Sequence, residues 1–223
     1  MNALVNDTNH CDGYSLITAL RQWVSLVKLN TLFLLFALPL VTLPAAYCAA
    51  LDISADLLRN QYHSPFMLTR FLNTFRRTFV LSMLAGLVIL ILEFIAAGSL
   101  YFYSVLAKSN LLYSLLCALA FAVMLAVLLL GISFYTALAT HYECSVRELL
   151  KLALYSTLLK PWLLLFGCSS TVLFWMLHII TFPFSIFLPI FFSLAVGIVM
   201  LTITSIQGVN QAFELLQLHK GKA

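Results

Sequence analysis

One acidic residue, Glu93, lies in the middle of a long apolar stretch and is the first candidate for chemistry in this chain. It follows Leu-Val-Ile-Leu-Ile-Leu and precedes Phe-Ile. An ionisable group at the centre of a membrane helix costs about 2.5–3.5 kcal/mol on insertion scales, so it should face the protein interior and have a partner. Two interpretations stay open. Glu93 is a proton, cation or substrate site, or it is a neutral carboxyl bonded to a hydroxyl or a backbone carbonyl.

His178 is the second candidate, near one end of a later apolar stretch. Both residues lie toward the outer side of the membrane in the topology given below. If the two helices pack together, Glu93 and His178 meet, which we state as a hypothesis. Other titratable residues offer less, because His141, Glu143 and Glu148 do not complete a metal-ligand set. The five cysteines are spread widely without a CxxC or CxH pair, so we predict no metal site and no cofactor.

The chain lacks the motifs of several large enzyme classes. It contains no Walker A loop, no GxSxG, no HExxH and no pair of carboxylates within one predicted span. An intramembrane enzyme needs two or more polar groups at membrane depth, whereas this chain offers Glu93 and at most His178. We therefore expect a protein that is not an enzyme.

The composition predicts the environment in which these residues work. Of the 223 residues, 63% are hydrophobic and 9% are charged, whereas a soluble domain carries about 25% charged residues. We predict an all-α, polytopic membrane protein with one membrane domain over residues 1–223. The net charge of +4 does not indicate a nucleic-acid partner, because the basic residues stand at helix ends. The partner that the composition does require is the lipid bilayer.

About five apolar stretches are long enough to cross a bilayer, which takes about 20 helical residues. Residues 1–28 precede them as a polar and then amphipathic segment. Pro39 and Pro44 lie in the first stretch, so we expect a kink or a wide turn there. The predicted spans are 29–51, 79–103, 111–136, 161–180 and 184–205.

The connections between the predicted spans alternate in basic charge. One set of connections holds Arg59, Arg70, Arg76, Arg77, Arg147, Lys151, Lys160, Lys220 and Lys222, and the other holds Arg21, Lys28 and Lys108. Short cytoplasmic loops are enriched in Lys and Arg. We therefore predict a multi-pass protein of the cell membrane with its N-terminus outside and its C-terminus in the cytoplasm.

Two of the predicted cytoplasmic connections, around residues 66–77 and 146–154, have the spacing of amphipathic helices. Both fit interfacial helices that lie flat on the inner membrane surface. The alternative is a docking surface for a cytoplasmic partner, with Arg70, Arg76, Arg77, Arg147 and Lys151 as the candidate contacts. The similar layout of the first and second pairs of spans is typical of a duplicated unit.

The first predicted span carries a sequence signature, Asn30-Thr-Leu-Phe-Leu-Leu-Phe-Ala-Leu-Pro39-Leu-Val-Thr42. With the later segments Phe71-Leu-Asn-Thr-Phe75-Arg-Arg-Thr-Phe79 and Leu149-Leu-Lys-Leu-Ala153-Leu, it resembles the YesL-type bacterial membrane proteins. Asn30, Pro39 and Thr42 are the signature residues. Two departures are Pro44 in place of the family's usual Gly, and Thr78 in place of an Asn.

The resemblance implies an accessory role in carbohydrate uptake, because members of this family are often encoded beside components of carbohydrate ABC importers. The implied partners are the permease or ATPase subunits of such an importer. No catalytic or binding residue carries over from the family. The alternative is a small secondary transporter or channel that uses Glu93 as an intramembrane polar site. Self-association into a homo-oligomer is compatible with either function.

Overall fold

The computed structural model describes residues 22–58, 66–107, 111–181 and 193–220, and within these ranges it contains helices and turns but no strand. Five helical stretches in these ranges are long and apolar enough to cross a membrane. The predicted all-α, polytopic class is therefore confirmed. The elements are η1 (Leu40–Thr42), α2 (Leu43–Leu58), α3 (Met67–Leu106), α4 (Leu111–Thr140), α5 (Val146–Leu159), α6 (Pro161–Ile180) and α7 (Leu194–Lys220); a further helix, Gln22–Ala37, precedes them.

The first predicted span is a broken helix. The helix Gln22–Ala37 ends before Pro39, and the chain continues through η1 into α2. Pro39 has an extended backbone with φ −75° and ψ 105°, and proline can neither donate the next helical hydrogen bond nor continue the helix without a clash. The expected kink is confirmed, and the stretch that can cross a membrane is Leu40–Leu58 rather than 29–51.

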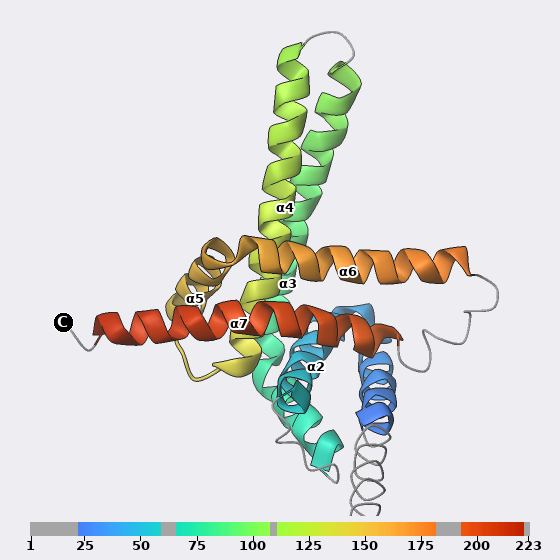
Figure 1. Ribbon diagram of the computed structural model, residues 1–223, viewed down its shortest axis with the longest axis vertical. Coiled ribbons are helices and arrows are strands. Elements are labelled where there is room, and N and C mark those ends of the chain that lie inside the picture. Colours follow the sequence, from blue (N-terminus) through green and yellow to red (C-terminus); the bar gives the residue numbers. More distant parts are fainter. Residues whose placement is uncertain (1–21, 59–65, 108–110, 182–192, 221–223) are drawn as a thin grey trace, which may run out of the picture.

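Helices α3 and α4 form a long hairpin whose far end stands away from the other helices (Figure 1). Helix α3 has 40 residues, about 60 Å at 1.5 Å per residue, which is twice the thickness of a bilayer core. The amphipathic segment 66–77 is therefore mostly the first part of α3 and not a separate surface helix. Within the single helix α3, the sequence changes from amphipathic to apolar at Thr78. This indicates that the surroundings of the helix change at that point.

The core lies around α2, which packs against α3, α4 and α7. Its buried side chains are mostly small: Ala45, Ala46, Cys48, Ala49 and Ala50 are all 0% exposed. Small residues allow helix backbones to approach closely, which strengthens dispersion contacts where lipid cannot supply a hydrophobic driving force. This alanine-rich face explains why one short helix can contact three others.

Helices α6 and α7 run side by side in opposite directions across the α3–α4 hairpin (Figure 1). Helix α6 has the bounds that the sequence predicts for the fourth span, 161–180. Helix α7 begins at Leu194, and residues 184–192 of the fifth predicted span lie outside the described residues. Helix α5 is a separate element, as expected, and its face of Leu149, Leu152 and Ala153 is buried.

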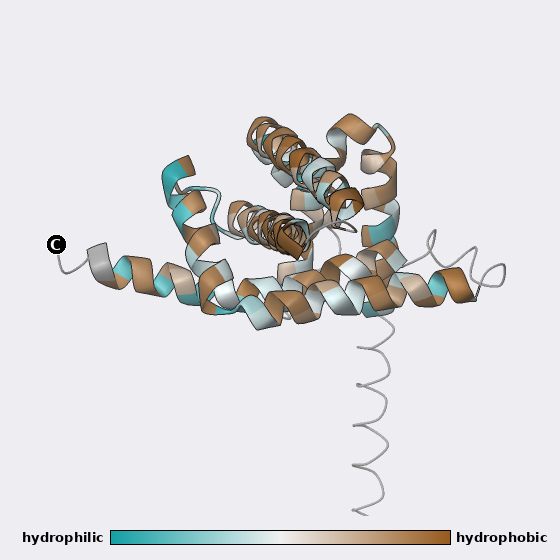
Figure 2. Cartoon of the chain, turned by 90° about the horizontal axis from the view of Figure 1, so that it is seen from above, coloured by the Kyte–Doolittle hydropathy of each residue, from teal (hydrophilic) through white to brown (hydrophobic). Residues whose placement is uncertain are grey.

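Much of the surface is apolar. Figure 2 shows hydrophobic residues over most of the length of the long helices, with hydrophilic residues in short stretches. Large apolar side chains are exposed on this surface, including Phe94 at 79% exposure and Leu111 at 77%. Patches of this extent are not stable in water. The chain is a multi-pass membrane protein.

Candidate functional site

A group of charged side chains, with two buried carboxylates and a half-exposed Arg70, joins α2 to α3. Arg70 donates from Nη2 to Asp52 Oδ1 at 3.1 Å and from Nε to Asp52 Oδ2 at 3.2 Å, and its Nη1 also pairs with Asp56 Oδ2. Thr74 donates its hydroxyl to Asp52 Oδ2 at 2.7 Å. Each pair, Asp52 with Asp56 and Arg70 with Thr74, is four residues apart, so both members face the same side of their helix.

The two carboxylates are almost completely buried, with Asp52 8% and Asp56 7% exposed. Burial of a charge is costly unless it is paired and hydrogen-bonded. The fork of Arg70 meets both needs, because a guanidinium can bind two carboxylates at once. Removing this partner would leave two buried anions, so this group fixes α3 against α2.

The sequence did not single out Asp52 or Asp56. The predicted first span ended at residue 51, which placed both aspartates in a cytoplasmic loop. In the structure the helix continues to Leu58, so both lie within it. The sequence feature that could have indicated them was a pair of acids spaced at i and i+4, shortly after a run of alanines. Arg70, which the sequence predicts as a docking residue, pairs with these two carboxylates.

The other predicted docking residues come from the first third of α3, Arg76 and Arg77, and from the first turns of α5, Arg147 and Lys151. The guanidinium carbon of Arg77 lies 3.0 Å from the centre of the Tyr142 ring, a cation–π geometry. This contact joins α3 to the turn between α4 and α5. Arg76, Arg147 and Lys151 are exposed. We call Arg76, Arg77, Tyr142, Arg147 and Lys151 the basic surface.

A capping box fixes where α5 begins and therefore where its basic residues point. Glu148 N donates to Ser145 Oγ at 3.4 Å, and Ser145 N donates to Glu148 Oε2 at 3.0 Å. Such a box satisfies two backbone donors at the helix start. With the apolar face of α5 buried against α4 and α7, Arg147 and Lys151 remain on the free side.

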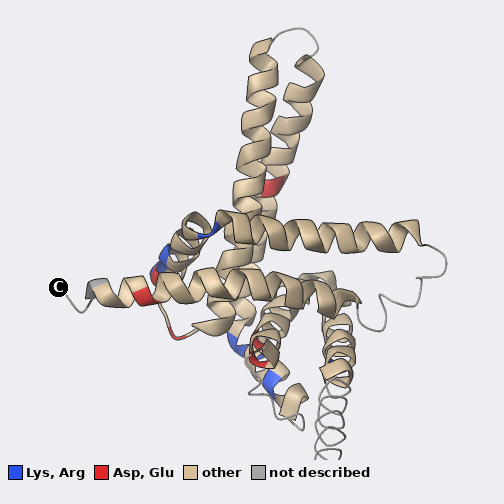
Figure 3. Ribbon diagram, viewed as in Figure 1, with Lys and Arg blue, Asp and Glu red and all other residues tan. Residues whose placement is uncertain are grey.

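Glu93 is half-buried on α3 within the hairpin. Its atom Oε1 is buried and has no hydrogen-bond partner among the described residues. Its helical neighbour Ile89, four residues earlier, packs against Gly131 of α4, so Glu93 follows the edge of the α3–α4 interface. Figure 3 shows Lys and Arg residues near α5 and the beginning of α3, and none among the described residues in the far part of the α3–α4 hairpin. The partner that the sequence led us to expect is not found in the described part of the chain.

His178 is buried between α6 and α7. Its Nε2 lies 2.6 Å from Ser193 Oγ, and its Nδ1 lies 3.0 Å from the carbonyl oxygen of Phe174. The rings of Phe174 and Trp175 lie 4.7 and 5.7 Å from the imidazole, measured between centroids. The structure therefore does not bring His178 to Glu93. His178 belongs to the α6–α7 contact, which sequence spacing could not reveal.

The three signature residues build the break before α2. Asn30 is fully buried, and its Oδ1 accepts a hydrogen bond of 3.0 Å from the backbone N–H of Ala195 in the first turn of α7. Pro39 ends the preceding helix. The Thr42 hydroxyl contacts the carbonyl oxygens of Phe36 and Pro39, the latter at 2.8 Å. These residues have a structural task, which is to shape the break and fix it to α7.

Within the described residues, no group of three His, Cys, Asp or Glu side chains is placed to hold a metal ion. A model of the family described as "Protein of unknown function, DUF624" matches residues 26–100. The matched segment contains the signature, the charged group of Asp52, Asp56 and Arg70, and Glu93. No curated protein and no solved structure matches the chain significantly.

Proposed function

We propose that this chain is a non-enzymatic accessory protein that docks a partner on the cytoplasmic side of the cell membrane through its basic surface. The observation that carries the proposal is the Arg77–Tyr142 contact at 3.0 Å. It holds α3 against the turn that leads into α5, although these two parts of the chain are distant in sequence. Arginine and aromatic residues are enriched in protein interfaces, and the exposed side chains of Arg76, Arg147 and Lys151 give this surface its charge.

The partner class comes from the resemblance to YesL-type proteins, with which the family match over residues 26–100 is compatible. That resemblance favours the permease or ATPase of a carbohydrate ABC importer. A basic surface fits an acidic patch on such a subunit, because complementary charge speeds association and selects partners. In the predicted topology, the N-terminus is outside the cell, and the basic surface and the C-terminus face the cytoplasm.

The experiment is affinity purification of the full chain from native membranes, scored for importer subunits by mass spectrometry. We expect the triple variant Arg76→Gln, Arg147→Gln, Lys151→Gln to lose most of the co-purified importer subunit at moderate salt. Glutamine removes the charge and preserves most of the length of the side chain. The control is Lys28→Gln, which removes an exposed charge on the predicted outer side. Equal recovery with the triple variant and the control, or no importer subunit with the wild type, would contradict the proposal.

Glu93 supports a second candidate function, that of a small secondary transporter or channel. The supporting observation is the buried Oε1 atom, which has no partner in the described part of the chain; intramembrane acids of this kind often serve proton relays or ion paths. The test is proton flux in vesicles containing the purified chain, followed with a pH-sensitive dye. Flux that is present in the wild type and lost in Glu93→Gln favours transport, and equal flux in both excludes this use of Glu93.

A further inference from the structure

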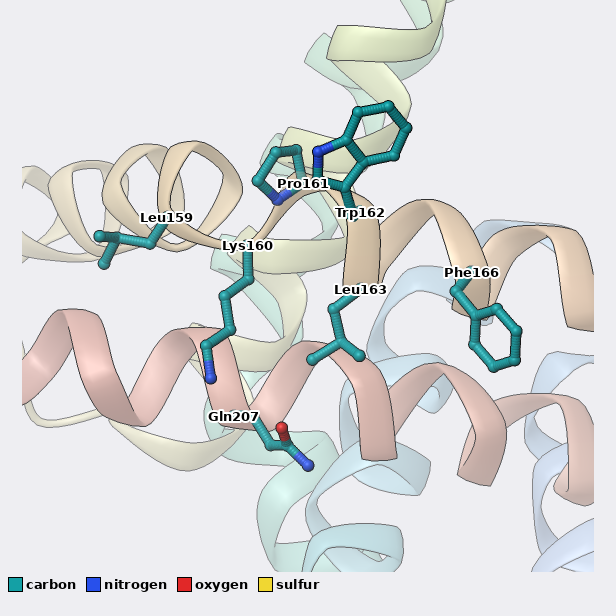
Figure 4. Close-up of a pocket in the computed structure, with 7 residues that line it drawn as sticks. All are labelled: Leu159, Lys160, Pro161, Trp162, Leu163, Phe166 and Gln207. Carbon is teal, nitrogen blue, oxygen red and sulfur yellow. The ribbon is translucent and has the colours of Figure 1, made fainter.

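A hollow of about 490 Å³ lies where α5 ends and α6 begins, beside α7. Figure 4 shows that Lys160 and Leu163 point from this junction toward α7, which contributes Gln207. Phe166 continues the lining one turn further along α6. The hollow therefore has a polar end, formed by Lys160 and Gln207, and an apolar wall, formed by Leu163 and Phe166.

The side chains of Lys160 and Gln207 at the polar end have no bonding partner among the described residues. Lys160 lies between two helices with a non-helical backbone, φ −134° and ψ 56°, so its side chain leaves the chain at the junction. No carboxylate in the part of the chain that the structure describes pairs with it. The exposed amide of Gln207 likewise makes no hydrogen bond to another described residue. An ammonium beside a free amide donor is a combination that binds a phosphate oxygen.

The apolar wall extends along α6. Leu163 and Phe166 lie three and six residues after Lys160, so they stand on roughly one face of α6. Phe166 is 68% exposed, which presents its ring to whatever occupies the hollow. A ligand that fills the whole hollow must therefore carry an anionic head at one end and a hydrocarbon chain at the other.

The position of the hollow along α6 agrees with this ligand. Helix α6 begins at Pro161 and is long and apolar enough to cross a membrane, and a lysine directly before such a span is suited to reach the lipid headgroups. Trp162, another lining residue, is 82% exposed, and tryptophan is enriched at that level. In the predicted topology this is the cytoplasmic leaflet, whose surface is negatively charged by anionic lipids.

We propose that this hollow binds one anionic phospholipid, with its phosphate on Lys160 and Gln207 and an acyl chain along Leu163 and Phe166. The site is separate from the basic surface, because Lys151 and Arg147 do not line the hollow. A lipid there would rest against all three helices at the junction and hold α5 to α6 and α7.

The test uses the full-length chain in detergent, titrated with phosphatidylglycerol or phosphatidylcholine and followed by native mass spectrometry and thermal unfolding. We expect phosphatidylglycerol to bind and stabilise the wild type more than phosphatidylcholine does. The variant Lys160→Gln should bind phosphatidylglycerol about fivefold more weakly, the effect of one lysine at an anionic surface. Lys28→Gln is the matched control, because it removes an exposed lysine of the helix Gln22–Ala37 that does not line the hollow, and it should bind like the wild type.

A second variant, Gln207→Ala, covers the case in which Lys160→Gln does not fold, and it should also weaken phosphatidylglycerol binding. Equal losses in Lys160→Gln and Lys28→Gln, or equal binding of the two lipids by the wild type, would overturn the proposal. Stabilisation by inorganic phosphate alone to the level reached with phosphatidylglycerol would also overturn it, because it would show a phosphate site without a role for the acyl chain. These readouts do not depend on whether an importer partner is found.

Discussion

The side-chain oxygen of Asn30 accepts a hydrogen bond from the backbone N–H of Ala195, across 165 residues of sequence. The first backbone N–H groups of a helix have no partner within that helix. Asn30 supplies one for α7 from a fully buried position, so a residue before the break in the first helix fixes where α7 begins. The asparagine of the signature thus connects the helix Gln22–Ala37 to α7.

Asn30→Ala is expected to destabilise the protein by about 1–3 kcal/mol, because it leaves the buried N–H of Ala195 without an acceptor. Thermal unfolding of the purified protein in detergent measures the loss. The neighbouring variant Thr31→Ala removes a hydroxyl that bonds only to the carbonyl of Val27 in its own helix and should change stability little. A midpoint for Asn30→Ala equal to that of Thr31→Ala would show that the hydrogen bond to Ala195 has no net effect.

Arg70→Met is expected to destabilise the protein by about 1.5–3 kcal/mol, because two buried carboxylates lose the hydrogen bonds of a half-exposed guanidinium. Arg76→Met, which changes an exposed arginine of the same helix, should cost less than about 0.5 kcal/mol. Combining Arg70→Met with Asp52→Asn and Asp56→Asn should restore part of the stability, since the uncompensated charges are then gone. No restoration in the triple variant would mean that the loss comes from packing of Arg70 and not from charge.

The sequence was sufficient to predict the fold class and the presence of apolar spans, because the length and apolarity of a span are local properties. The fourth span was predicted with the bounds of α6, since Pro161 starts a helix at its first position. The contacts between helices were not predictable in the same way. His178 bonds to Ser193 and Arg70 to Asp52 because of how the helices are arranged around the alanine-rich α2, and no pattern within one segment encodes that arrangement. Glu93 was recognised from the sequence because the apolar residues that precede and follow it belong to its own helix.

Thr42→Val is expected to destabilise the protein by about 0.5–1.5 kcal/mol, the usual net value of one hydrogen bond, because the break before α2 loses this bond. The valine has nearly the same shape but cannot donate to the carbonyl oxygens of Phe36 and Pro39. Thr42→Ser retains the hydroxyl and should remain close to the wild type. The comparison of the two unfolding midpoints isolates the hydroxyl, and equal midpoints would contradict its role at the break.

Gly167→Ala tests the close contact between α6 and α7. A Cβ atom added at Gly167 would overlap the side chain of Thr204 on α7, whereas one added at Gly98 meets no atom within 4 Å. Overpacking in a helix interface costs about 1–3 kcal/mol, so Gly167→Ala should lower the unfolding midpoint. Gly98→Ala should leave it unchanged or raise it slightly, because alanine favours helix.

The double variant Gly167→Ala, Thr204→Ala distinguishes steric overlap from other causes. Truncating Thr204 removes the side-chain atoms that the new methyl group would meet, so the pair should be more stable than Gly167→Ala alone. Thr204 donates its hydroxyl to the carbonyl oxygens of Met200 and Leu201 in its own helix, and the single variant Thr204→Ala corrects for that loss. If the two changes are additive in a double-mutant cycle, the methyl group and Thr204 do not meet and the packing of α6 on α7 must differ from the one described.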